Sequence, residues 1–113
     1  VWQRRTNDRK GNLNSSCNYC TTLEGLANRK GWRVPTIEEL ASLIDMNNVN
    51  PALPNNHPFT NVKNEDYWSV STVPGHPDWA WSVNFSNGYV LRMDKSNSYR
   101  VLCVRGRHGY DAR

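Results

Sequence analysis

The chain has 113 residues, which is enough for a single domain over residues 1–113 with one small core. Only 37% of its residues are hydrophobic, and no apolar run approaches the ~20 residues of a membrane-spanning helix, so membrane insertion is not expected. The formal net charge is +4, but no zinc-finger spacing, RNP-like strand or recognition-helix pattern accompanies the basic residues, which argues against nucleic acid as the partner.

A helix is the first regular element that the sequence predicts, after a basic stretch over residues 1–13. Ser15 or Ser16 can cap its start, because a serine hydroxyl accepts hydrogen bonds from the free amides of a first turn. We expect this helix to run to about Lys30, where Gly31 supplies the usual C-terminal stop.

A second, shorter helix follows the extended link over residues 32–35. Thr36 and Glu39 match a capping box, in which each side chain accepts a hydrogen bond from the backbone amide of the other residue. The apolar stripe of an amphipathic helix that ends near Asp45 comprises Ile37, Leu40, Ala41, Leu43 and Ile44.

Residues 46–66 show neither a helical nor a strand period. Repeated Asn and the prolines at positions 51, 54 and 58 favour turns, so we expect a long loop anchored by Phe59. A loop of this length in a small domain is uncommon and often functional.

A β-hairpin is predicted in the last third of the chain. Four large apolar side chains fall on alternate positions: Trp79, Trp81, Val83 and Phe85. An extended backbone points all four to one side. Residues 87–88 (Asn-Gly) suit a two-residue turn, and residues 89–93 then return.

Short strands over residues 67–71 and 99–105 complete the predicted elements. Two helices come first and several strands afterwards, which is typical of an α+β domain with an antiparallel sheet.

The three cysteines leave several pairings open. Cys17 and Cys20 lie three apart on the predicted first helix, and Cys103 lies in the last strand. A Cys20–Cys103 bridge would leave Cys17 free and close most of the chain into a loop, which is worth roughly 4–5 kcal/mol, so we favour it. The alternatives are a zinc site with His108, a Cys17–Cys20 redox pair, or three reduced cysteines.

No catalytic constellation emerges from the sequence. His57, His76 and His108 lie beside Pro or Gly in polar segments, without a Ser or Cys nucleophile in a matching motif. The carboxylate pairs at 38–39 and 65–66 are adjacent and therefore point apart. We expect no enzyme, no cofactor and no bound metal.

Several blocks of the chain, in order, resemble the family of the C-terminal domain of the Legionella collagen-like adhesin (Lcl). The blocks are residues 1–4 (VWQR), 18–20 (NYC), 31–40 (GWRVPTIEEL), 50–52 (NPA), 67–69 (YWS), 80–88 (AWSVNFSNG) and 101–106 (VLCVRG). The blocks over 31–40 and 80–88 are specific when they occur together. The resemblance spans nearly the whole chain.

The resemblance implies a C-type-lectin-like fold, related to that of the formylglycine-generating enzymes: two helices packed on a small, twisted antiparallel sheet with long loops. It implies core roles for Trp32, Trp68, Trp81 and Phe85. The paired cysteines of the family map onto Cys20 and Cys103, and Cys17 is a departure. The acidic triplets of calcium-dependent lectins and the copper-binding Cys pair of the enzymes are missing here.

The resemblance also implies an extracellular or surface-anchored bacterial domain. The collagen-like member of the family binds sulfated glycosaminoglycans and forms trimers. Because residue 1 is Val, with neither Met nor a signal peptide, we expect a processed product or an excised domain. We expect a secreted or cell-surface recognition and adhesion domain whose partner is an anionic, sulfated polysaccharide.

The proposed ligand contacts are polar residues of the hairpin and the last strand: Tyr89, Arg92, Lys95, Tyr99, Arg100 and Arg107. Arginine forks pair bidentately with sulfate or carboxylate, and lysine adds a point charge. A two-residue turn would place Arg92 opposite Val83, on the aromatic face, where it would be half buried.

The alternative function is a protein-binding or self-assembly module, with diversified ligand binding as one form of it. The partner would then be a host or cell-surface protein, or further copies of the chain in a trimer. Trp79 and Tyr110 would be the interface anchors.

Overall fold

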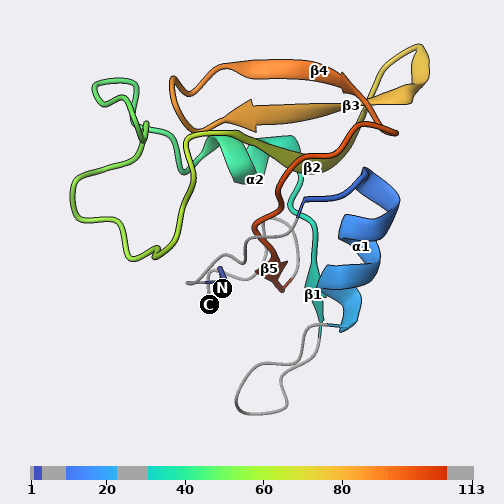
Figure 1. The fold of residues 1–113 in the computed structure, drawn as a ribbon, viewed down its shortest axis with the longest axis horizontal. Helices are drawn as coiled ribbons and strands as arrows, with labels where there is room; N and C mark the ends of the chain where they lie inside the picture. Colours follow the sequence, from blue (N-terminus) through green and yellow to red (C-terminus); the bar gives the residue numbers. More distant parts are fainter. Residues whose placement is uncertain (1, 4–9, 23–30, 107–113) are drawn as a thin grey trace.

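The computed structural model describes residues 2–3, 10–22 and 31–106. Its elements are α1 (Leu13–Thr22), β1 (Trp32–Arg33), α2 (Ile37–Ala41), β2 (Asp66–Val73), β3 (His76–Asn84), β4 (Val90–Asp94) and β5 (Val104–Arg105). β2, β3 and β4 form an antiparallel sheet in that order, and β1 pairs with β5 in a second one (Figure 1). The predicted α+β class, with two helices and small antiparallel sheets, is confirmed, and the likeness to C-type lectins stays a prediction.

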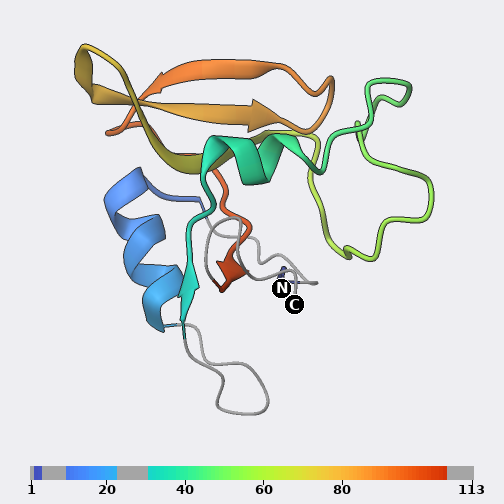
Figure 2. The same cartoon turned by 180° about the vertical axis from the view of Figure 1, so that it is seen from behind.

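The three-stranded sheet separates two hydrophobic clusters. Tyr67 and Trp68 are neighbours on β2, so their side chains leave the sheet on opposite sides. Tyr67 packs with Leu40 of α2 in one cluster, and Trp68 packs with Ala80 and the disulfide in the other. Figures 1 and 2 show α2 on one side of this sheet and the chain that approaches β5 on the other.

α1 begins one turn earlier than predicted. The amide of Ser15 donates to Oδ1 of Asn12 at 2.8 Å, so Asn12 is the cap and the prediction of Ser15 or Ser16 is wrong. An Asn side chain caps a helix as well as a serine does, and Leu13 then enters the core from the first turn. The expected end near Lys30 lies outside the described residues.

α2 has the predicted capping box. Oγ1 of Thr36 accepts from the amide of Glu39 at 3.2 Å, and Oε1 of Glu39 accepts from the amide of Thr36 at 2.9 Å. The α-helix ends at Ala41, earlier than the predicted end near Asp45. The amide of Ile44 donates to Ala41, three residues back, so the last turn is tightened into 3₁₀ geometry.

The hairpin turn is longer than the predicted two residues. β3 ends at Asn84 and β4 begins at Val90. The amide of Gly88 donates to the carbonyl of Asn84 at 2.7 Å, and the amide of Asn84 donates to the carbonyl of Tyr89 at 2.9 Å. The four residues between Asn84 and Tyr89 therefore form the turn.

The packing of Phe85 explains this longer turn. Its ring is fully buried and stacks on Tyr67, with centroids 4.4 Å apart, and its amide donates to the carbonyl of Glu65 instead of a β4 residue. Gly88 keeps the expected positive φ, 81°, and any Cβ there would lie 2.7 Å from Cγ2 of Ile44. Close packing as well as backbone conformation therefore requires glycine at this point.

The predicted last strand over residues 99–105 is mostly irregular, and only β5 is regular. Residues 99–103, which we call the crossing segment, lead from the three-stranded sheet to the two-stranded one. The carbonyl of Arg100 accepts from the amide of Trp68 at 2.8 Å, and the carbonyl of Cys103 accepts from the amide of Gln3 at 2.9 Å. A chain that changes sheets cannot keep one ladder, which accounts for the lost strand.

Cys20 of α1 and Cys103 of the crossing segment form a disulfide, as predicted, with Cα atoms 5.7 Å apart. Cys17 is free. The bridge removes the partner that a Cys17–Cys20 redox pair needs. It also takes two of the three sulfur ligands of the zinc alternative, whose fourth ligand, His108, lies outside the described residues.

The disulfide carries a testable stability prediction. The Cys20→Ala/Cys103→Ala double variant should lose about 4 kcal/mol of unfolding free energy, because the bridge closes a loop of 83 residues in the unfolded chain. Urea unfolding followed by tryptophan fluorescence measures the loss. Cys17→Ala is the matched control and should stay within about 1 kcal/mol of the parent, since it breaks no bridge. A double variant as stable as the parent would contradict the prediction.

A second prediction concerns the stability of the fold at acidic pH. Both oxygens of Glu39 accept from Arg33, at 2.7 and 2.8 Å, and these hydrogen bonds lower the pKa of Glu39 from 4.5 to about 2. A lowered folded-state pKa gives stability that is present above pH 4.5 and is lost as the pH falls toward 2. Glu39→Gln should therefore lose up to about 3 kcal/mol at pH 7 and less at pH 2.

The measurement is unfolding free energy against pH for the parent, Glu39→Gln and Glu38→Gln. Glu38 is exposed in the same turn and lies outside the capping box, so its variant should follow the parent curve. Parallel curves for Glu39→Gln and the parent between pH 5 and pH 2 would rule out this role of the ion pair.

Candidate functional site

One side of the β3–β4 hairpin carries aromatic and charged side chains that are only partly covered. Direct cross-strand pairs point to the same side of a sheet, and the pairs here are Trp79 with Asp94, Trp81 with Arg92, and Val83 with Val90. Val83 is fully buried under α2, whereas the other pairs remain half-buried or exposed. We call His76, Trp79, Trp81, Val90, Arg92 and Asp94 the hairpin face.

Trp79 is the centre of the hairpin face. The ring of His76 stacks on it with centroids 4.5 Å apart and an interplanar angle of 13°. The guanidinium carbon of Arg92 lies over the same ring, 5.6 Å from its centroid, which is within the range of a cation–π contact. These contacts hold the exposed Arg92 side chain against an aromatic support.

Trp81 corrects the expectation of a core role. Trp32, Trp68 and Phe85 are buried as predicted, but Trp81 is half-buried and belongs to neither hydrophobic cluster. The predicted alternation of side chains along β3 is right. The prediction fails because no element that the structure describes covers the part of this face where Trp81 lies. α2 is only five residues long and covers the Val83 end of the face, so the tryptophan end is left open to solvent.

Arg92 and Tyr89 are the most accessible of the predicted ligand residues that the structure describes. Arg92 is exposed, and it forms no ion pair with any residue of the described ranges. Tyr89 is 59% exposed immediately before β4. Lys95 lies on the other side of the hairpin from Arg92, where its Nζ donates to Oγ1 of Thr72 at 2.9 Å.

The other predicted residues lie elsewhere. Tyr99 packs edge-on against Trp68, with its hydroxyl 3.3 Å from the sulfur of Met93. Arg100 donates to both oxygens of Glu65, and its side chain is only 11% exposed. Arg107 lies outside the described residues. The structure thus places Arg92 at an open surface and leaves the five described residues on separate surfaces, while the contact of all six with a ligand stays a prediction.

Glu65 neutralises two of the basic residues. Lys10 donates to it at 2.8 Å and Arg100 at 3.1 Å, and these two cations lower the pKa of Glu65, with the Lys10 hydrogen bond as the main cause. The carbonyl of Arg100 also accepts from the amide of Trp68. Arg100 therefore has a clear structural role in joining the crossing segment to β2.

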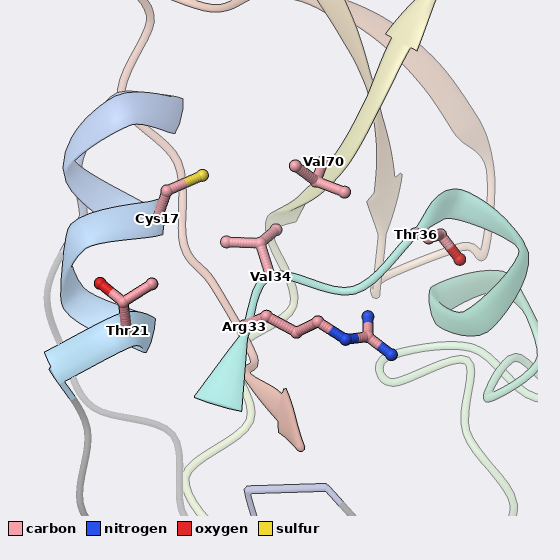
Figure 3. A pocket seen from close by; sticks show the side chains of 6 residues that line it. All are labelled: Cys17, Thr21, Arg33, Val34, Thr36 and Val70. Carbon is pink, nitrogen blue, oxygen red and sulfur yellow. The ribbon is translucent and has the colours of Figure 1, made fainter. Parts of the chain in front are cut away.

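A hollow of about 350 Å³ lies between α1, the link before α2, and β2 (Figure 3). It is lined by Cys17, Thr21, Arg33, Val34, Thr36 and Val70. The thiol of Cys17 points into it, while the guanidinium of Arg33 points away toward Thr36 (Figure 3). Burial raises the pKa of Cys17, so the thiol stays protonated at neutral pH and is a poor nucleophile.

Neither a metal site nor a membrane span is found within the described ranges. No group of three or more His, Cys, Asp or Glu residues is placed there to hold a metal ion. None of the helices described is long and apolar enough to cross a membrane.

Comparison with known protein families identifies a family whose sequence pattern covers most of the chain. The family described as the Lcl C-terminal domain matches residues 1–105. No curated protein matches the sequence. The match covers both helices, the hairpin face and both cysteines of the disulfide.

Proposed function

The chain belongs to the Lcl C-terminal domain family, which is adhesin-related, and on that basis we propose that it is a non-enzymatic, extracellular recognition domain that binds an anionic glycan. The ligand class is a sulfated sugar chain, and the contact surface is the hairpin face.

The observation that carries this proposal is the position of Arg92. Its guanidinium is exposed, lies over Trp79 and has no carboxylate partner among the described residues. A guanidinium offers two parallel N–H donors to a sulfate or carboxylate group. The partly exposed rings of Trp79 and Trp81 beside it offer flat apolar surfaces to the pyranose rings of the same ligand.

One further predicted residue lies beside this surface along the hairpin. Tyr89 adds an exposed ring at the start of β4, whereas Lys95 lies on the other side of the hairpin against Thr72. A glycan that contacts Arg92 would reach Tyr89 by following β4, the edge strand of the sheet.

The disulfide supports the extracellular part of the proposal. Disulfides form and persist in oxidising compartments, which include the cell surface and the secreted space. A domain that depends on the Cys20–Cys103 bridge is therefore suited to work outside the cytosol, either secreted or at the cell surface.

A second candidate function is protein binding or self-assembly, including a trimer. Four large apolar side chains are exposed in the loop after α2 and around the start of β4: Met46 (66%), Val49 (67%), Tyr89 (59%) and Val90 (44%). The two segments lie together, because the Cβ position of Gly88 is 3.1 Å from the sulfur of Met46. Exposed apolar side chains that gather in one place favour contact with another protein surface.

The glycan proposal is tested with Arg92→Gln and a sulfated heparin-type oligosaccharide. The variant should raise the dissociation constant about tenfold, because it removes charge-assisted hydrogen bonds to the anion. Titration calorimetry at two salt concentrations measures this, and binding should weaken steeply with added salt. The desulfated oligosaccharide should bind much more weakly.

Lys10→Gln is the matched control, since it removes one exposed positive charge away from the hairpin face. It should change the dissociation constant less than twofold. Equal losses in both variants would show that net charge alone drives binding, which contradicts the proposal. Salt-insensitive binding to a protein partner, or concentration-dependent trimers in sedimentation, would favour the second candidate.

A further inference from the structure

A polar hollow of about 340 Å³ lies in the loop between α2 and β2. It is lined by Asn48, Val49, Asn50, Pro51, Leu53, Pro54, Asn55 and His57. Its volume is at the lower end of the range of small-molecule sites, which suits a ligand of one ring better than an extended one.

The lining carries polar groups without fixed charge. None of the eight described residues around the hollow is Asp, Glu, Lys or Arg. Calcium sites in proteins are built largely from carboxylates, and sulfate or phosphate sites need cationic or helix-terminal donors. The chemistry of the hollow therefore suits neither a cation nor an anion.

Three of the lining side chains are held in place by hydrogen bonds. Nδ2 of Asn48 donates to the carbonyl of Leu53 at 2.7 Å. Oδ1 of Asn50 accepts from the hydroxyl of Ser86 at 2.6 Å, which ties the loop to the hairpin turn. Nδ1 of His57 accepts from the amide of Phe59 at 3.2 Å, and the two rings stack.

These bonds determine which groups remain for a ligand. Asn48 retains Oδ1 as an acceptor, and Asn50 retains its amide nitrogen as a donor. Because Nδ1 of His57 is an acceptor, the proton of the neutral ring is on Nε2, which is a donor. The exposed side-chain amide of Asn55 supplies one more donor and one more acceptor.

We propose that this hollow is a binding site for one uncharged sugar residue. A sugar hydroxyl both donates and accepts, and it therefore matches fixed amide and imidazole groups of both kinds. The site is separate from the hairpin face, because it uses no charge and none of the hairpin-face residues. Fixing the side chains before binding lowers the entropy cost of ordering them.

The test uses the methyl glycosides of glucose, galactose, mannose and N-acetylglucosamine, titrated one at a time into the whole chain and followed by NMR chemical shifts. At least one glycoside should bind saturably at the hollow. Its dissociation constant should be the same at low and at high salt. The Asn55→Ala/His57→Phe double variant should raise that constant about tenfold, by removing two hydrogen-bonding groups. Phe at position 57 keeps the ring stack on Phe59.

Asn14→Ala is the matched control, because it removes an exposed amide from α1 and should leave binding unchanged. Arg92→Gln should also leave binding of the neutral glycoside unchanged, which separates this site from the anionic one. The proposal is overturned if none of the four glycosides saturates, if the double variant binds as well as the parent, or if added salt abolishes binding. A denaturation midpoint close to that of the parent shows that the double variant is folded.

Discussion

The Cys20–Cys103 disulfide joins the parts of the fold that regular secondary structure does not join. Cys103 ends the crossing segment, which leaves one sheet and enters the other without a continuous ladder. Short hydrogen-bonded contacts hold its backbone: Tyr99 pairs with Gly11, Arg100 bonds to Asp66 and Trp68, and Cys103 bonds to Gln3. The covalent link to α1 compensates for this irregular pairing. It also holds α1 against the cluster around Trp68, on which the three-stranded sheet rests.

The exposure of the hairpin face depends on how much of it α2 leaves uncovered. Strand alternation places Trp79, Trp81 and Val83 on one side of the sheet, and the short α2 buries only Val83. A longer helix would bury both tryptophans, and the positive charge of Arg92 would then carry a desolvation cost. The early end of α2 therefore keeps an arginine supported by aromatic rings at the surface.

Features set by neighbouring residues could be predicted from the sequence, whereas features set by distant contacts, the Cys20–Cys103 disulfide apart, could not. The capping box of Thr36 and Glu39 is local, so the sequence pattern alone was sufficient to predict it. The hairpin turn differs from the predicted two-residue turn because Phe85 stacks on Tyr67, which is distant in sequence, and does not pair with β4. The role of Arg100 depends in the same way on Glu65, thirty-five residues earlier. The hollow beside Asn50 also needs its distant partner Ser86, although the long loop itself was predicted.

A domain that recognises ligands can change its contacts only where they do not also hold the fold together. Arg100 and Arg33 each form a two-point ion pair with a carboxylate, and replacing either would remove hydrogen bonds that join separate segments of the fold. Arg92 has no such partner in the described ranges, and its exposed side chain lies over the ring of Trp79, so a change there costs little stability. The same contrast holds in the loop, where Asn50 is tied to the hairpin and Asn55 is exposed. Substitutions at positions 55 and 92 can therefore alter the binding proposed above while the disulfide-linked framework stays intact.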